Sequence, residues 1–338
     1  PSNGKILALA SSPSYDPNRF IKGLDEKTWQ ELASSKDFPL QNRALTGQYP
    51  PGSVFKIVMA LAALEEGVVT PEEEISCNGS LSLGNATYRC WKKHGHGRVN
   101  LHRALVESCD VYFYTLGRRL GVDKIAQYAR RLGLGKETGI DLDTEKGGLI
   151  PTTQWKLKRW GIPWQQGETV ISAIGQGFVL TTPLQMANLI SSVFNGGRMY
   201  TPQVTEWVRK ANGESLFEFA AISRETGIKP RHLALVKNAL VGVVNQPHGT
   251  GSKARLNDIV VAGKTGTAQV VALRKEGASK REEDIPWEFR DHAWFVAIAP
   301  ASEPEIAVAV LIEHGGHGGS AAAPTAKEII KAYLQARS

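Results

Sequence analysis

Tyr49-Pro-Pro-Gly-Ser-Val-Phe-Lys-Ile-Val-Met-Ala-Leu-Ala-Ala-Leu-Glu-Glu66 is the stretch of the sequence that decides the fold. Its proline- and glycine-rich opening interrupts regular structure just before Ser53. From Ser53 to Glu66 apolar residues lie on nearly every helical face, a pattern typical of a buried helix, and Gly67 is a suitable C-terminal cap. Ser53 and Lys56 lie on the same face of that helix. The sequence therefore predicts a buried helix that begins with a serine and a lysine side by side.

The rest of the chain predicts a mixed fold of class α+β. We expect a first strand at residues 5–13, an irregular polar stretch at 18–45, and late strands at 258–270, 293–299 and 305–312. Helical patterns are predicted between and after them: two within 100–133, and one each at 181–195, 228–245 and 324–336. Strands so close in sequence favour antiparallel pairing. We expect one domain over residues 1–338, an antiparallel sheet flanked by helices with a mainly helical block of about 60–250 inserted.

The composition is that of an ordinary globular domain. Among 338 residues 42% are hydrophobic and 22% charged, and no run of 18 apolar residues occurs. The net charge of +7 would suit a nucleic acid, an anionic lipid or an acidic polymer. Lysines and arginines are scattered without interleaved aromatic residues, so no nucleic-acid partner is predicted. The chain enters its first predicted strand without a signal peptide, so we expect it to be part of a longer protein.

Two further motifs carry polar chemistry. Ser108-Cys109-Asp110 fits a loop between two helices, where a second hydroxyl can relay a proton and a short polar side chain can hold a substrate amide. Lys264-Thr-Gly-Thr267 fits a strand in which Gly266 permits close backbone approach. The hydroxyls of Thr265 and Thr267 can bind a carboxylate, and the backbone N–H groups of Thr267 and Ser53 can form an oxyanion hole. The charged segment 271–290 that follows is predicted to be a mobile flap beside this strand.

The two lysines are predicted to differ in protonation. A serine hydroxyl is a poor nucleophile without a nearby base. Lys56 lies on a buried helix, so we expect a depressed pKa and the role of general base. Lys264 is expected to stay charged and attract a carboxylate. Each motif alone has a simpler explanation, a helix cap for the serines and Asp110 or an ordinary strand glycine, but chance does not account for the set in this order.

The ordered set S-x-x-K, S-x-D and K-T-G resembles the signature of penicillin-binding proteins and serine β-lactamases. Further stretches are similar to class B penicillin-binding proteins: Ile6–Pro17, Tyr49–Lys56, Ile174-Gly-Gln-Gly177, Thr182–Ala187 and His292-Ala-Trp-Phe295. The resemblance covers nearly the whole chain. Asp110 stands where the common motif has asparagine, and this resembles the elongation-type penicillin-binding protein 2.

The resemblance implies a penicilloyl-serine transferase fold, like that of β-lactamases, and a peptidoglycan D,D-transpeptidase. Ser53 would attack a D-Ala-D-Ala stem peptide with Lys56 as base, Ser108 and Lys264 would shuttle protons, and Asp110, Thr265, Gly266 and Thr267 would bind substrate. The acyl group would pass to the amine of a neighbouring stem peptide, and β-lactams would acylate the same serine. It also implies an N-terminal anchor and pedestal, the extracytoplasmic face of the membrane, and partners that include a membrane glycosyltransferase and elongation proteins.

Two rival functions share this fold. A D,D-carboxypeptidase or a β-lactamase would need an efficient route for the deacylating water, for which the sequence offers no added motif. A non-catalytic β-lactam sensor would acylate once and would have a shorter sequence. Turnover of a chromogenic β-lactam separates rapid hydrolysis from a long-lived adduct.

All three cysteines fall between residues 77 and 109, with histidines among them. Zinc in structural sites takes four Cys or His ligands, and the predicted set is Cys77, Cys90, His96 and Cys109, at intervals of 13, 6 and 13 residues. His96 is preferred because glycines on both sides let the backbone bend around a ligand. The alternative is a Cys77–Cys90 disulfide with Cys109 a buried thiol. The elongation-type resemblance also allows a structural zinc site beside the second motif.

Overall fold

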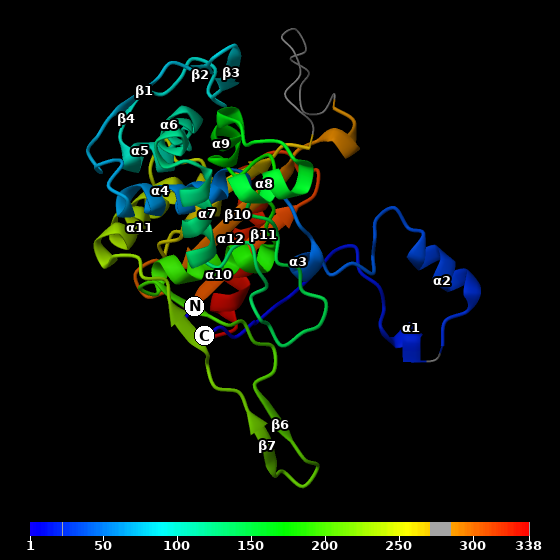
Figure 1. Cartoon of the computed structure of the whole chain (residues 1–338). Helices are drawn as coiled ribbons and strands as arrows, with labels where there is room; N and C mark the ends of the chain where they lie inside the picture. The colour runs from blue at the N-terminus through cyan, green and yellow to red at the C-terminus, as the bar shows by residue number, and fades with distance from the viewer. Residues whose placement is uncertain (22, 271–284, 338) are drawn as a thin grey trace.

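A three-stranded antiparallel sheet lies at the centre of the computed structural model, which describes residues 1–21, 23–270 and 285–337 (Figure 1). Its strands are β9 (Ala262–Ala268), β10 (His292–Ala299) and β11 (Ile306–Ile312), in the order β11-β10-β9. The register runs from His292 opposite Ala268 to Ile298 opposite Ala262. Within the sheet β9 has a strand on one side only, so its other edge can meet a different partner.

Alternate side chains of β10 enter two separate cores. Trp294, Val296 and Ile298 pack in the larger core, whereas Phe295 and Ala297 pack in a smaller core on the other face. The smaller core is closed by the C-terminal helix α12 (Ala322–Gln335), and the larger by α10 (Pro183–Phe194) and most of α11 (Pro230–Asn245). Helices thus cover both faces of an antiparallel sheet, which confirms the predicted α+β class.

The helix α4 (Lys56–Glu65) lies in the larger core, and all of its residues from Lys56 to Leu64 are buried. A 3₁₀ helix, η1 (Gly52–Phe55), leads into it, so the regular α-helix begins at Lys56 rather than at Ser53. Besides α11, three helices pack around α4: α5 (Leu101–Val106), α6 (Asp110–Leu120) and α7 (Val122–Arg131). The sequence predicted two helical patterns over this range; Gly121, with φ of 74°, separates α6 from α7 and makes a third.

The remaining elements are short. The helices are α1 (Asn18–Ile21), α2 (Glu26–Ala33), α3 (Arg43–Thr46), α8 (Thr153–Trp160), α9 (Gln166–Ser172), η2 (Ser252–Ala254) and η4 (Trp287–Phe289). The strands form four antiparallel pairs: β1 (Ile75–Cys77) with β4 (Gly97–Val99), β2 (Ser80–Leu83) with β3 (Ala86–Arg89), β5 (Arg198–Tyr200) with β8 (Ser223–Glu225), and β6 (Trp207–Arg209) with β7 (Ser215–Glu218). Figure 1 shows the β6–β7 hairpin projecting from the rest of the molecule.

Three boundary predictions are wrong. Residues 5–13 do not form a strand of the sheet: Lys5 makes one isolated bridge with Gln203, and among the described residues this segment forms no other β-bridge. The polar stretch 18–45 contains α1, α2 and the start of α3, and the strand expected from residue 258 begins at Ala262. Most of the predicted flap, residues 271–284, lies outside the described residues. Among the described helices none is long and apolar enough to cross a bilayer.

Candidate active site

Ser53 lies in η1, where the chain passes against the edge of β9. Gly52 has a φ of 54°, and a Cβ atom there would come within 2.4 Å of the Thr267 carbonyl oxygen. A glycine is therefore required by both the backbone conformation and the space. The indole of Trp294 also donates a hydrogen bond to the Pro50 carbonyl, at 3.0 Å. These contacts hold the Ser53 loop beside the strand that carries the third motif.

The Lys56 ammonium lies at the centre of a buried hydrogen-bond network. Its Nζ is 2.8 Å from the Ser108 carbonyl oxygen, 3.1 Å from Ser108 Oγ and 2.6 Å from Asp110 Oδ1. Lys56 itself is fully buried, and the Asp110 side chain is only 11% exposed. Water therefore screens this ion pair little, and the pair joins the first motif directly to the second.

Ser108 lies between the two lysines of the site. It occupies the predicted loop between α5 and α6, with a left-handed φ of 55° that non-glycine residues rarely adopt. Lys264 Nζ is 2.9 Å from Ser108 Oγ, the same hydroxyl that Lys56 contacts. The structure thus brings Lys56, Ser108 and Lys264 together, and a single hydroxyl links both lysines.

The expectation that Lys264 stays charged is contradicted. Burial, followed by the charge of Lys56, lowers the pKa of Lys264 well below its ordinary value, although Asp110 opposes this. Lys264 is fully buried, and its hydrogen bonds go to Ser108 Oγ and the Thr265 carbonyl. The ion pair with Asp110 belongs to Lys56 instead. The sequence could not assign the ion pair because it depends on where the α5–α6 loop places one carboxylate.

Both carboxylate oxygens of Asp110 have partners within the protein. Oδ1 accepts from Lys56, and Oδ2 accepts from the backbone N–H of Trp91 at 2.9 Å. The Trp91 indole also donates to the carbonyl oxygens of Glu107 and Ser108, at 3.1 and 3.0 Å. Trp91 was not identified from the sequence, in which it is one of eight tryptophans. It ties the loop of the second motif to the segment before β4.

The edge of β9 provides backbone groups next to Ser53. Gln176 Nε2 donates to the Thr267 carbonyl at 2.8 Å. In an antiparallel strand the N–H and C=O of one residue point to the same side, so the Thr267 N–H also faces away from β10. The predicted oxyanion donor on Thr267 therefore points toward the side where Gly52 lies.

The other residues of the third motif lie in the same strand. Gly266 is required by space, because a Cβ atom would come within 2.7 Å of the Pro51 carbonyl oxygen. Thr265 Oγ1 forms a hydrogen bond of 2.7 Å with Thr250 Oγ1. The sequence did not identify Thr250, whereas Gln176 falls in the Ile174–Gly177 stretch that was noted without a role.

A family model described as the penicillin binding protein transpeptidase domain matches residues 1–331. The chain belongs to the penicillin-binding protein transpeptidase family. It is 38% identical to the peptidoglycan D,D-transpeptidase MrdA of Haemophilus influenzae, over 100% of this chain and 52% of the relative. For MrdA of Acinetobacter baumannii the identity is 39%, over 100% of this chain and 50% of the relative. The chain thus spans about half the length of the curated relatives it matches.

Solved structures of PBP2 proteins share the fold of this transpeptidase domain. A complex between PBP2 and MreC from Helicobacter pylori matches with a TM-score of 0.87 and 34% identity, over 100% of this chain and 59% of that chain. Pseudomonas aeruginosa PBP2 in complex with WCK 5153 matches with a TM-score of 0.86 and 37% identity, over 98% and 72%. The predicted fold and the resemblance to the elongation-type penicillin-binding protein 2 are confirmed.

The four residues predicted as metal ligands come together in the transpeptidase domain. One ligand atom from each of Cys77, Cys90, His96 and Cys109 lies within 4.8 Å of the others, and all four residues are buried. His96 Nδ1 is 3.6 Å from Cys77 Sγ and 3.5 Å from Cys90 Sγ. A tetrahedral zinc site with ordinary bond lengths needs about 3.6 Å between nitrogen and sulfur. All three cysteines are free, so the Cys77–Cys90 disulfide is absent here, and the residues present fit a zinc ion.

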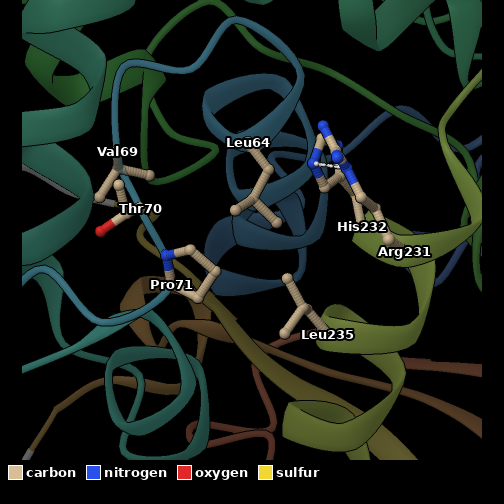
Figure 2. Close-up of a pocket in the computed structure, with 7 residues that line it drawn as sticks. All are labelled: Leu64, Val69, Thr70, Pro71, Arg231, His232 and Leu235. Atoms are coloured by element: carbon tan, nitrogen blue, oxygen red, sulfur yellow. Dashed lines mark hydrogen bonds between the residues drawn. The ribbon is translucent and has the colours of Figure 1, made fainter.

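A cavity of about 370 Å³ lies at the far end of α4. Figure 2 shows Leu64 at one side of it, Val69, Thr70 and Pro71 at another, and Arg231, His232 and Leu235 of α11 opposite. Leu64 is eight residues from Lys56, which is about 12 Å along a helix. None of the residues predicted from the motifs lines this cavity, so it is separate from the Lys56 network.

Proposed function

We propose that this chain is the catalytic domain of a peptidoglycan D,D-transpeptidase with Ser53 as the nucleophile. The observation that supports this most is the buried network in which Ser108 Oγ links Lys56 and Lys264 one helical turn from Ser53. Such a network gives a serine at a helix start a route for its proton. The family relationship and the names of the relatives agree with this chemistry.

In the proposed reaction Ser53 Oγ attacks the carbonyl carbon of the penultimate D-alanine. The developing oxyanion accepts hydrogen bonds from the N–H groups of Ser53 and Thr267. Burial favours the neutral amine of Lys264, which therefore has a lone pair free to accept a proton. As Lys56 accepts the proton of Ser53, it passes one of its own protons to Ser108 Oγ, and Ser108 passes its hydroxyl proton to Lys264. When the C–N bond breaks, that proton returns through Ser108 to the departing D-alanine, and an acyl ester remains on Ser53.

The second half-reaction passes the acyl group to the amine of a neighbouring stem peptide. The amine attacks the ester carbon, Ser53 leaves with a proton, and a new peptide cross-link forms. β-Lactams would acylate Ser53 by the first half-reaction alone. Thr265, Gly266 and Thr267 would bind the substrate along the edge of β9, whereas Asp110 would position Lys56 and Ser108 because both of its oxygens are already engaged.

For the whole protein we propose a role in cell elongation at the extracytoplasmic face of the membrane, held there by an N-terminal anchor and pedestal. A protein of the MreC kind and a membrane glycosyltransferase are the proposed partners. The Helicobacter pylori PBP2 is named in a complex with MreC, and a further relative of known structure is named as part of a peptidoglycan synthase complex.

Covalent labelling by a fluorescent penicillin tests the nucleophile. Ser53→Ala should abolish labelling while the melting temperature stays nearly unchanged, because Ser53 is only partly buried. Labelling that persists in Ser53→Ala overturns the assignment. With a chromogenic β-lactam, a stoichiometric long-lived adduct is expected, and rapid turnover would favour the β-lactamase alternative instead.

We further propose that Cys77, Cys90, His96 and Cys109 hold one structural zinc ion. A hydrogen bond from Cys109 lowers the pKa of the Cys90 thiol, so one thiolate is favoured even before a metal binds. Zinc would supply stability and no chemical step. Elemental analysis of protein purified without metal-affinity resin should give one zinc per chain, and chelation should lower the melting temperature. Zinc well below one equivalent, together with a Cys77–Cys90 linked peptide, would exclude this site.

A further inference from the structure

Four aromatic rings form a cluster on the surface of the helical block. Trp155 and Trp160 of α8 have ring centroids 5.0 Å apart, and each lies near the ring of Phe178, at 5.3 and 5.1 Å. Trp164 lies 6.2 Å from Phe178. Trp160 remains 46% exposed although two aromatic rings pack against it. We call Trp155, Trp160, Trp164 and Phe178 the aromatic platform.

The aromatic platform is held in place by polar contacts underneath. The buried Lys156 of α8 forms an ion pair with Glu168 of α9, at 2.5 Å, and its Nζ also donates to the Pro163 carbonyl. The Trp164 indole donates to Thr169 Oγ1 at 2.8 Å. These bonds fix α8 and the segment after it to α9, which lies beside α8 in Figure 1. The exposed Trp160 and the three half-buried rings therefore belong to a fixed surface, and fixed aromatic rings lose little conformational entropy when they bind a ligand.

The platform is connected through the chain to the edge of β9. Phe178 follows Gln176 by two residues, which span at most about 7 Å. Gln176 donates to the Thr267 carbonyl at 2.8 Å and accepts from the Gln269 N–H at 3.3 Å. One end of the platform therefore lies within a few residues of a side chain that contacts the edge of β9, along which the substrate is proposed to lie.

The chemistry of the platform fits a sugar with nearby carboxylates. Pyranose rings present C–H faces that pack on the flat faces of aromatic rings, and an indole offers an apolar face of large area. Lys158 and Arg159 on the same helix are exposed, and neither forms an ion pair within the part of the chain that the structure describes. Two exposed cations on the helix that also carries the exposed Trp160 suit an acidic glycopeptide better than a bilayer interior or an uncharged apolar surface.

We propose that the aromatic platform is a subsite for the glycan of the peptidoglycan strand, with Lys158 and Arg159 facing carboxylates of its stem peptides. This inference rests on the proposed transpeptidase function, because it extends the substrate from the stem peptide to the sugars that carry it. It assigns Trp160 a role in strand binding and none in acylation. A substrate that lacks sugars should therefore not sense a change at Trp160.

The test compares two donors of the same stem peptide, one linked to its disaccharide and one free. Trp160→Ala should raise KM for the disaccharide-linked donor about three- to tenfold, as expected for the loss of one aromatic contact, and leave KM for the free peptide unchanged. Trp160→Phe should restore most of the affinity. The matched control is Trp207→Ala, since Trp207 is 51% exposed but lies on the projecting β6–β7 hairpin.

The outcomes separate the subsite from the catalytic assignment. Acylation by a fluorescent penicillin should be equal in the wild-type chain and in Trp160→Ala, and a wild-type chain that fails to acylate would refute the proposed function itself. An equal rise in KM for both donors in Trp160→Ala would overturn the subsite. A rise in KM of the same size in Trp207→Ala would overturn it as well. An unchanged KM for the disaccharide-linked donor would also overturn the subsite, even if Trp160→Ala weakened binding to anionic vesicles.

Discussion

Removing the Asp110 carboxylate should destabilise the domain strongly, because it leaves the Lys56 ammonium alone in the core. Lys56 is fully buried and Asp110 Oδ1 lies 2.6 Å from its Nζ. In Asp110→Ala the ammonium keeps the carbonyl and hydroxyl of Ser108 as hydrogen-bond acceptors but has lost its counter-charge. The backbone N–H of Trp91 also loses its acceptor. The charge must then be buried unpaired or the lysine must lose its proton.

The expected loss can be worked from these contacts. Breaking a buried ion pair by removing one partner costs about 3–5 kcal/mol of unfolding free energy. Asp110→Asn is a milder change: its amide oxygen can still accept from Lys56, but its NH₂ group then faces the Trp91 N–H, another donor. One donor is left unsatisfied, so we expect a loss of about 1–3 kcal/mol.

Urea unfolding followed by tryptophan fluorescence at pH 7 gives both values. The matched control is Asp123→Ala, because the Asp123 carboxylate also has both oxygens engaged, by the N–H and hydroxyl of Thr153, but in an exposed position. We expect the control to lose about 1 kcal/mol or less. A loss below 1 kcal/mol in Asp110→Ala would show that Lys56 does not depend on this carboxylate, and the proposed proton route would have to be abandoned.

Two further predictions concern groups outside the network. Burial, with a smaller effect of the His314 charge, lowers the pKa of His292 from 6.5 to about 4, although Glu313 opposes this. As the pH falls, the unfolded chain therefore protonates His292 before the folded chain does. The free energy of unfolding should fall by roughly 2 kcal/mol between about pH 6.5 and 4, after discounting for solvent screening. His292→Asn keeps an acceptor for the His314 N–H and should flatten that part of the melting-temperature profile; an identical slope would contradict the assignment. At the end of α4, Glu65 accepts from the Lys229 N–H and the buried His232 Nδ1. Glu65→Ala should cost about 1–3 kcal/mol in urea unfolding, and a neutral result would show that water replaces the carboxylate.

The sequence predicted the sheet and the site best where the signal is local. The apolar pattern after Ser53, the three late strands and the C-terminal helix all follow from periodicity within one segment, and they were placed to within a few residues. The prediction of a first strand was wrong because the alternation of apolar and polar residues in 5–13 does not show whether a neighbouring strand is available to pair with it. The sheet ends at β9 on one side and at β11 on the other. Likewise the ligand set was identified from clustering along the chain, whereas the protonation of Lys264 depends on contacts between segments more than 150 residues apart.

Trp91 explains why aspartate suits this second motif. Two donors converge on residue 110, a buried ammonium and a backbone N–H, and only a carboxylate accepts from both while balancing the charge. The donor N–H belongs to the residue after Cys90, and the Trp91 ring lies 5.4 Å from the ring of His96. Two residues of the Cys/His cluster are therefore next to the segment that holds the Asp110 carboxylate in place. Cys109 lies between Ser108 and Asp110 in the chain, so any bond that fixes the cluster also fixes both groups that contact Lys56. Stability of the cluster and alignment of Lys56 are consequently linked in this fold, and loss of either should lower the acylation rate of Ser53, the proposed nucleophile.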